Sequence, residues 1–144
     1  MKNFKSGFTM IELVFVIVVL GILAAVAIPR FAATRVDAQI SKGAADVASI
    51  RSAIVSERQS RLIAGDTAWI TKEDLDDGNE LFKGVLMYPQ KNIANKDGAW
   101  SRTGAEGSGT YVYRAGGVST TFTYDEDDGT FTCTAGAGYC DQLQ

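Results

Sequence analysis

The chain has 144 residues, of which 46% are hydrophobic and 22% charged, so we expect one domain with at most an added anchor or tail. The net charge is −3, and residues 65–144 carry thirteen Asp and Glu against six Lys and Arg. This acidity argues against nucleic-acid binding, which needs basic side chains to neutralise phosphates. The sequence has no histidine, the commonest general base and metal ligand, so we expect neither an enzyme nor a cofactor.

The hydrophobic residues are concentrated near the N-terminus. Residues 8–28 carry a single charge, Glu12, and as a helix they would span about 31 Å, close to the hydrocarbon thickness of a bilayer. The basic start, with Lys2 and Lys5, predicts a cytoplasmic flank. A secretory signal and a plain membrane anchor are the alternatives, but neither explains a carboxylate in an apolar layer, where it is costly.

Glu12 would gain a partner if the chain were cut between Gly7 and Phe8. The cut creates a positive amino group on Phe8, in the same apolar layer as the carboxylate. Each charge would then reduce the desolvation cost of the other. The pair could close within one chain or between neighbouring chains. In the second case Glu12 would set the register of stacked helices.

The stretch "KSGFTMIELVFVIVVLGILAAVAIP" resembles the class III signal and N-terminal helix of type IV pilins and type II secretion pseudopilins. The family pattern is Gly, an apolar residue, Thr-x-x-Glu and a long hydrophobic run closed by Pro. The sequence matches this pattern at Gly7, Phe8, Thr9, Glu12 and Pro29, and the resemblance covers roughly the first 30 residues.

The resemblance implies processing, location and assembly. A prepilin peptidase would remove the leader, residues 1–7, and N-methylate Phe8. Residues 8–29 would be a transmembrane and filament-core helix, and residues 30–144 a pilin-like head. The protein would cross the bacterial inner membrane once, with its head in the periplasm. An inner-membrane assembly platform would then build a helical homopolymer in which Glu12 governs assembly.

The residue pattern after Pro29 is amphipathic, so we expect one helix over residues 8–64 with a kink at that proline. Its first half is hydrophobic on all sides, and its second half carries an apolar stripe on one face. "GD" at residues 65–66 ends the helix. The stripe predicted to face the head consists of Phe31, Val36, Ile40, Val47, Ile50, Ile54 and Leu62.

Short runs rich in Thr, Tyr, Phe and Val predict antiparallel strands at residues 111–114, 120–124 and 130–134, the last two joined as a hairpin. The fold class is therefore α+β, with the long helix packed on a small sheet. The strand aromatics (Tyr111, Tyr113, Phe122, Tyr124 and Phe131) should face the helix as core, although they could instead stack on DNA or a partner.

Between helix and sheet we expect a short helix capped by Thr71 and a strand or extended loop at residues 84–89. The side chains predicted to pack on the long helix from this region are Trp69, Leu75, Leu81, Phe82 and Tyr88.

Cys133 and Cys140 lack the spacing of a zinc or redox motif, which favours a structural disulfide over two unpaired buried thiols and indicates an oxidising compartment. Many type IV pilins also have a C-terminal disulfide. Calcium is the one cofactor candidate, at Asp125, Asp127 and Asp128. The spacing lacks the distal Glu of an EF-hand, so a solvated turn is the favoured interpretation.

The small head favours a pseudopilin of a type II secretion system, assembled into a periplasmic pseudopilus. The alternatives are a pilin of a surface pilus for adhesion or motility, a DNA-uptake pseudopilin, and a membrane-tethered binding module. Arg51, Arg58 and Arg61 could pair with the acidic head of the next subunit or form a solvated face.

Overall fold

The computed structural model describes residues 7–144, so the predicted leader lies outside the described residues except for Gly7. The chain divides into two compact units, with the boundary between Arg35 and Val36. We call the described residues up to Arg35 the N-terminal unit, and Val36–Gln144 the head unit.

Helix α1 spans Met10–Ile63 and contains Pro29, which confirms the long helix. It ends in a Schellman motif, in which the Asp66 N–H donates to the Arg61 carbonyl (2.9 Å) and the Gly65 N–H to the Leu62 carbonyl (3.1 Å). Gly65 adopts φ 88°, a left-handed conformation that costs glycine little. The kink at Pro29 stays a prediction.

The head unit contains a four-stranded antiparallel sheet in the order β3-β4-β5-β6. Its strands are β3 (Ala99–Arg102), β4 (Thr110–Ala115), β5 (Val118–Tyr124) and β6 (Phe131–Cys133). Gly116 and Gly117, with φ 53° and 81°, form the two-residue turn between β4 and β5, which needs positive φ at both positions. The structure therefore confirms the α+β fold and the predicted pairing of β5 with β6.

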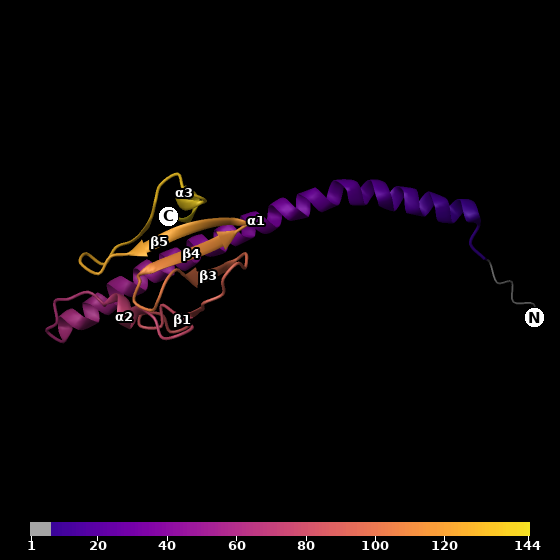
Figure 1. The fold of residues 1–144 in the computed structure, drawn as a ribbon. Coiled ribbons are helices and arrows are strands. Elements are labelled where there is room, and N and C mark those ends of the chain that lie inside the picture. Colours follow the sequence, from indigo (N-terminus) through magenta and orange to yellow (C-terminus); the bar gives the residue numbers. More distant parts are fainter. Residues whose placement is uncertain (1–6) are drawn as a thin grey trace, which may run out of the picture. The chain divides into compact units, whose positions relative to one another are not determined.

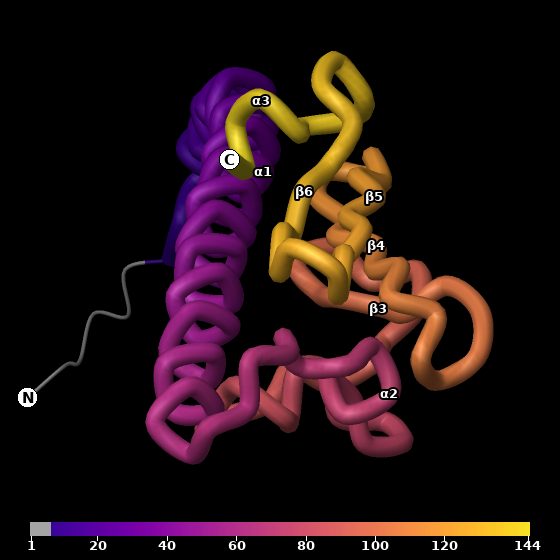
Figure 2. Tube along the Cα trace, turned by 90° about the vertical axis from the view of Figure 1, so that its left-hand side faces the viewer, coloured from indigo at the N-terminus to yellow at the C-terminus, as the bar shows by residue number. Residues whose placement is uncertain are grey.

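The inner face of the sheet packs on α1 and forms the core of the head unit (Figures 1 and 2). Alternate residues along β4 and β5 are buried, as expected for strands with one face on a core. The five strand aromatics are all buried, which confirms them as core and removes them as a stacking surface. From α1 the core takes Val47, Ile50 and Ile54, whereas Phe31 (74% exposed) and Leu62 (47% exposed) were wrongly assigned to the buried stripe.

The connection from helix to sheet contains α2 (Lys72–Leu75) and a two-stranded sheet of β1 (Glu80–Leu81) and β2 (Gln90–Lys91). Thr71 caps α2 as expected, accepting a hydrogen bond from the Asp74 N–H. Residues 84–89 form turns and bends and no strand. Leu75, Leu81 and Phe82 are fully buried and Trp69 is partly buried against the core, but Tyr88 is 82% exposed, so its predicted packing on the helix is wrong.

A buried ion pair fixes this connection to the sheet. Arg102 Nη1 lies 3.1 Å from Asp76 Oδ2, and the two side chains are 10% and 0% exposed. The other Asp76 oxygen accepts the N–H of Phe82, which has a positive φ of 60°. Breaking a buried pair leaves an uncompensated charge, so this contact constrains the loop strongly.

The contact of α1 with the C-terminal end of the chain depends on Gly43. A Cβ atom there would lie 2.4 Å from Tyr113 and 2.7 Å from Leu143, both fully buried. We therefore expect Gly43→Ala to destabilise the head by about 1–3 kcal/mol through overpacking, despite the higher helix propensity of alanine.

The measurement is urea unfolding of the full chain in detergent, followed by tryptophan fluorescence. Ser41→Ala, at an exposed position of the same helix, is the control and should change stability by less than about 0.5 kcal/mol. Equal unfolding midpoints for Gly43→Ala and wild type would contradict the packing.

Candidate processing and assembly site

The peptide bond predicted to be cut lies just before α1. Gly7, Phe8 and Thr9 are outside the helix and exposed, and the Phe8 side chain is 84% exposed. The chain is thus open to a partner at Gly7–Phe8. The roles of Gly7 in cleavage and of Phe8 in cleavage and N-methylation stay predictions.

Thr9 and Glu12 form a capping box at the start of α1. The Thr9 Oγ1 accepts the Glu12 N–H at 3.3 Å, and Glu12 Oε2 lies 3.5 Å from both the Thr9 N–H and the Thr9 hydroxyl. The Thr9 carbonyl accepts the Leu13 N–H, which makes Thr9 the N-cap residue. The contacts of the Glu12 carboxylate are long and therefore weak.

The pattern of Thr followed three residues later by Glu, ahead of an apolar run, is the sequence signature of a capping box. Sequence reasoning missed it because Glu12 was assigned wholly to pairing with the Phe8 amine. The capping box and that pairing involve the same carboxylate.

The apolar half of α1 has no cover within the described chain. It is the stretch long and apolar enough to cross a membrane, and none of it is buried. Its large side chains are exposed from Met10 to Ile28. Such a surface needs lipid or other apolar side chains around it.

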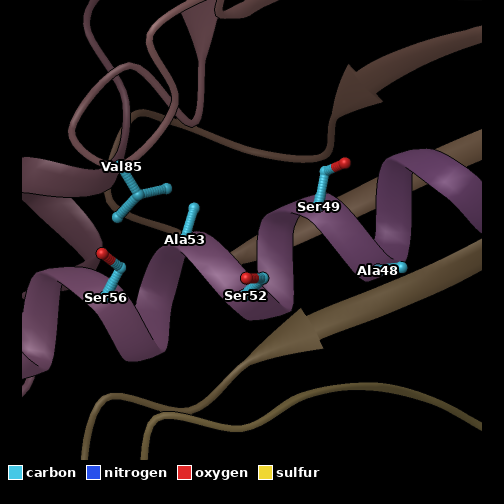
Figure 3. Close-up of a pocket in the computed structure, with 6 residues that line it drawn as sticks. All are labelled: Ala48, Ser49, Ser52, Ala53, Ser56 and Val85. Atoms are coloured by element: carbon cyan, nitrogen blue, oxygen red, sulfur yellow. The ribbon is translucent and has the colours of Figure 1, made fainter.

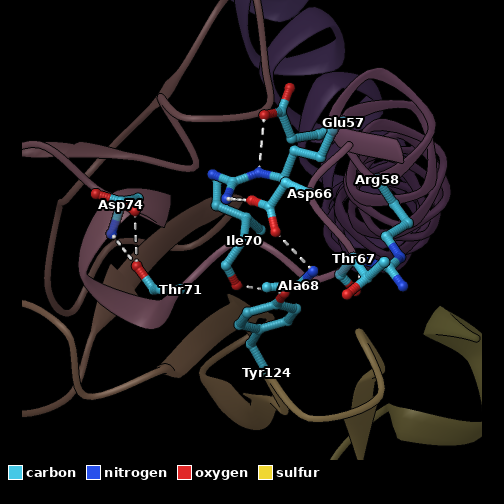
Figure 4. Close-up of polar contacts among 10 residues, drawn as sticks. Glu57, Arg58, Asp66, Thr67, Ala68, Ile70, Thr71, Asp74 and Tyr124 are labelled. Atoms are coloured by element: carbon cyan, nitrogen blue, oxygen red, sulfur yellow. Dashed lines mark hydrogen bonds and ion pairs between the residues drawn. The ribbon is translucent and has the colours of Figure 1, made fainter. Parts of the chain in front are cut away.

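The arginines in the second half of α1 bind residues of their own head unit, and Figure 4 shows the surroundings of Arg58. Arg51 donates to the Phe131 carbonyl (2.9 Å), Arg58 to the Thr67 carbonyl, and Arg61 pairs with Glu57 (3.1 Å). The guanidinium of Arg58 also covers the ring of Trp69. Arg51 and Arg58 therefore join the helix to other parts of the head, so a merely solvated face is wrong for these two, and pairing of the arginines with the next subunit stays a prediction.

The acidic loop between β5 and β6 uses its carboxylates in turns. Asp125 accepts the Asp127 N–H, and Asp128 accepts both the N–H and the hydroxyl of Thr130. The two hydrogen bonds from Thr130 lower the pKa of Asp128. Among residues 7–144, no group of three or more acidic, Cys or His side chains is arranged to hold a metal ion.

One shallow hollow on the head lies beside α1 (Figure 3). It is lined by Ser49, Ser52, Ser56, two alanines and Val85. No acidic or basic side chain lines it, so its serines have no general base beside them to activate them. Because its lining side chains are small, another chain could approach the backbone of α1 closely at this hollow.

The C-terminus is closed onto the head by a disulfide between Cys133 and Cys140, whose Cα atoms are 5.8 Å apart. Cys140 begins α3 (Cys140–Leu143). Leu143 at the other end of α3 is fully buried in the core, so the disulfide and this side chain hold the last residues together.

Comparison with known proteins finds similarity for part of the chain. A family model for the prokaryotic N-terminal methylation motif matches residues 2–28. Relatives named type IV major fimbrial protein FimA, from Dichelobacter nodosus, are 41% identical to the chain over 54 residues. The N-terminal segment of the chain is therefore similar to the methylation motif of that family model, and part of the chain is similar to type IV fimbrial proteins. No solved structure matches the chain.

The pilin match is confined to one part of the protein. It covers 38% of this chain and 35% of each FimA relative, so the chain matches about a third of their length. The match to the family model contains Gly7, Phe8, Thr9 and Glu12. The remainder of the head is characterised by its structure alone.

Loss of the disulfide should weaken the head by about 2.5 kcal/mol, the loop-entropy value for cysteines seven positions apart. We expect a reducing agent to lower the urea midpoint of the full chain in detergent. The variant Cys133→Ser/Cys140→Ser should start at the lower midpoint and should not respond to the reducing agent. If the reducing agent also lowered the urea midpoint of that variant, the change in stability would not be due to loss of the disulfide.

Proposed function

We propose that the protein is a structural subunit of a type IV filament, processed by a prepilin peptidase. The observation that supports this most is the order of features in the N-terminal unit. An exposed Gly7–Phe8 bond precedes the capped start of α1, and an uncovered apolar helix with one acid follows. In the inner membrane, lipid would cover this helix, and in a filament other copies of it would.

The Glu12 carboxylate directs assembly by pairing with the new N-terminal amine of a neighbouring subunit. Cleavage before Phe8 produces an ammonium group four residues from the carboxylate. The present hydrogen bonds of that carboxylate to Thr9 are 3.5 Å long, whereas a charge-assisted bond to an ammonium is shorter and about twice as strong. The carboxylate can therefore leave Thr9 for the amine of a neighbouring subunit.

Among type IV filaments, we propose a pseudopilus of a type II secretion system, with the head in the periplasm. The small head unit, Val36–Gln144, supports this choice. The second candidate is a pilin of a surface pilus, which the C-terminal disulfide and the fimbrial relatives favour. Expression beside the assembly platform and ATPase of each system, with filaments counted by electron microscopy, tests the two.

Glu12→Leu should be cleaved and inserted into the membrane, because the Thr9 hydroxyl still caps α1. Its filament yield should fall at least about tenfold, since loss of one partner of a desolvated charge pair costs several kcal/mol. Sheared filaments and the membrane fraction are compared by immunoblot, with Asp37→Asn, a change to an exposed acid of the head unit, as control. Wild-type filament yield from Glu12→Leu would contradict the pairing.

Gly7→Glu should block maturation, because it places a bulky charge where a peptidase must approach the backbone before Phe8. Intact-mass spectrometry should find the full-length chain. Gly21→Ala, where an added Cβ meets nothing within 4 Å, is the control and should be processed normally. A chain beginning at Phe8 in the Gly7→Glu variant would show that the cut site is assigned wrongly.

A further inference from the structure

The start of α1 lies only two residues after the bond to be cut. Gly7, Phe8 and Thr9 are non-helical, and the helix begins at Met10. The capping box described above sets this boundary. The inference below deepens the proposed function, because it concerns how the prepilin peptidase gains access to the bond.

Because the Thr9 hydroxyl satisfies a backbone N–H at the start of α1, the helix does not need to begin earlier in the chain. The hydroxyl accepts the Glu12 N–H at 3.3 Å, one of the donors that a helix start leaves without a partner. In an α-helix that same N–H would bond to the carbonyl of Phe8, four residues before it. In an apolar layer no water can replace the hydroxyl, so a chain without it satisfies this N–H by extending the helix.

Extension of the helix would make the bond a poor substrate. Hydrolysis adds the hydroxyl of water to the Gly7 carbonyl carbon and a proton to the Phe8 nitrogen, and it breaks the C–N bond between them. In an extended helix, the Gly7 carbonyl would accept the Ile11 N–H, and neighbouring side chains would surround the bond. Proteases cut exposed chain that local structure leaves free.

We propose that Thr9 is a positioning residue for processing. Its hydroxyl makes α1 begin at Met10 and thereby keeps the Gly7–Phe8 bond outside the helix, where the peptidase can reach it. Glu12 contributes mainly through its backbone N–H, because the contacts of its carboxylate with Thr9 are longer. Processing thus depends on the Thr9 hydroxyl, whereas assembly depends on the Glu12 carboxylate.

The test measures cleavage of the full chain in detergent by purified prepilin peptidase. Thr9→Val keeps the shape of the side chain and removes the acceptor. Loss of an N-cap costs about 1 kcal/mol, which corresponds to a decrease of up to about fivefold in the non-helical population. Because only this population binds productively, KM should rise by up to about fivefold with kcat unchanged.

Two further variants separate capping from direct recognition of the Thr9 side chain. Thr9→Ser keeps an N-cap acceptor and should be cut like wild type. Thr9→Val/Met10→Pro restores the helix start by other means, because proline suits the first helical position and keeps the residue before it out of the helical region. This double variant should regain the wild-type KM.

Each outcome decides one point. A wild-type KM for Thr9→Val would overturn the inference, and so would failure of the added proline to lower the raised KM, which would indicate direct contact between Thr9 and the peptidase. If the peptidase does not cut the wild-type chain at all, the proposed processing is wrong. Cleavage of wild type with no effect of Thr9→Val leaves the proposed function intact and removes the inference alone.

Discussion

Helix α1 has to suit two environments with one continuous backbone. Its first half presents apolar side chains on every side and finds no cover within the described chain, whereas its second half buries a stripe of Val47, Ile50 and Ile54 against the sheet. Hydrogen bonds inside the helix serve both environments, so the polar backbone groups at its two ends need separate partners. The Thr9 hydroxyl provides one at the start, and the Schellman motif at Gly65 provides them at the end.

The distribution of charged contacts divides the chain into parts with different tasks. In the head unit, Arg51, Arg58 and Arg61 bind backbone carbonyls and carboxylates of the same unit, and Arg102 neutralises the buried Asp76. These charges maintain the head. Within residues 7–144, by contrast, the Glu12 carboxylate has only long contacts, both with Thr9. It is the acid in the apolar half of α1 and can change partner without disturbing the head.

The sequence predicts the long helix, strands β4, β5 and β6 and their aromatic inner face because each depends on local periodicity, whereas the short strands β1, β2 and β3 were not predicted. Periodicity does not tell which positions of the helix stripe the sheet covers, so the exposure of Phe31 and Leu62 was missed, and Tyr88 lies in turns that have no periodicity. The ion pair of Asp76 with Arg102 joins residues 26 positions apart and leaves no local signal. The capping box does leave a local signal in the sequence, the stretch "TMIE", but only the geometry shows that the Thr9 hydroxyl accepts the Glu12 N–H.

The closed C-terminus restricts where the protein can be labelled. Leu143 is fully buried, and the disulfide between Cys133 and Cys140 holds α3 on the head. A fusion or affinity tag joined after Gln144 would therefore pull on a packed side chain. Met87 and Tyr88 are exposed, whereas Val85 and Leu86 just before them pack against the core, so an epitope inserted between Met87 and Tyr88 would leave the core intact and would be accessible to antibodies.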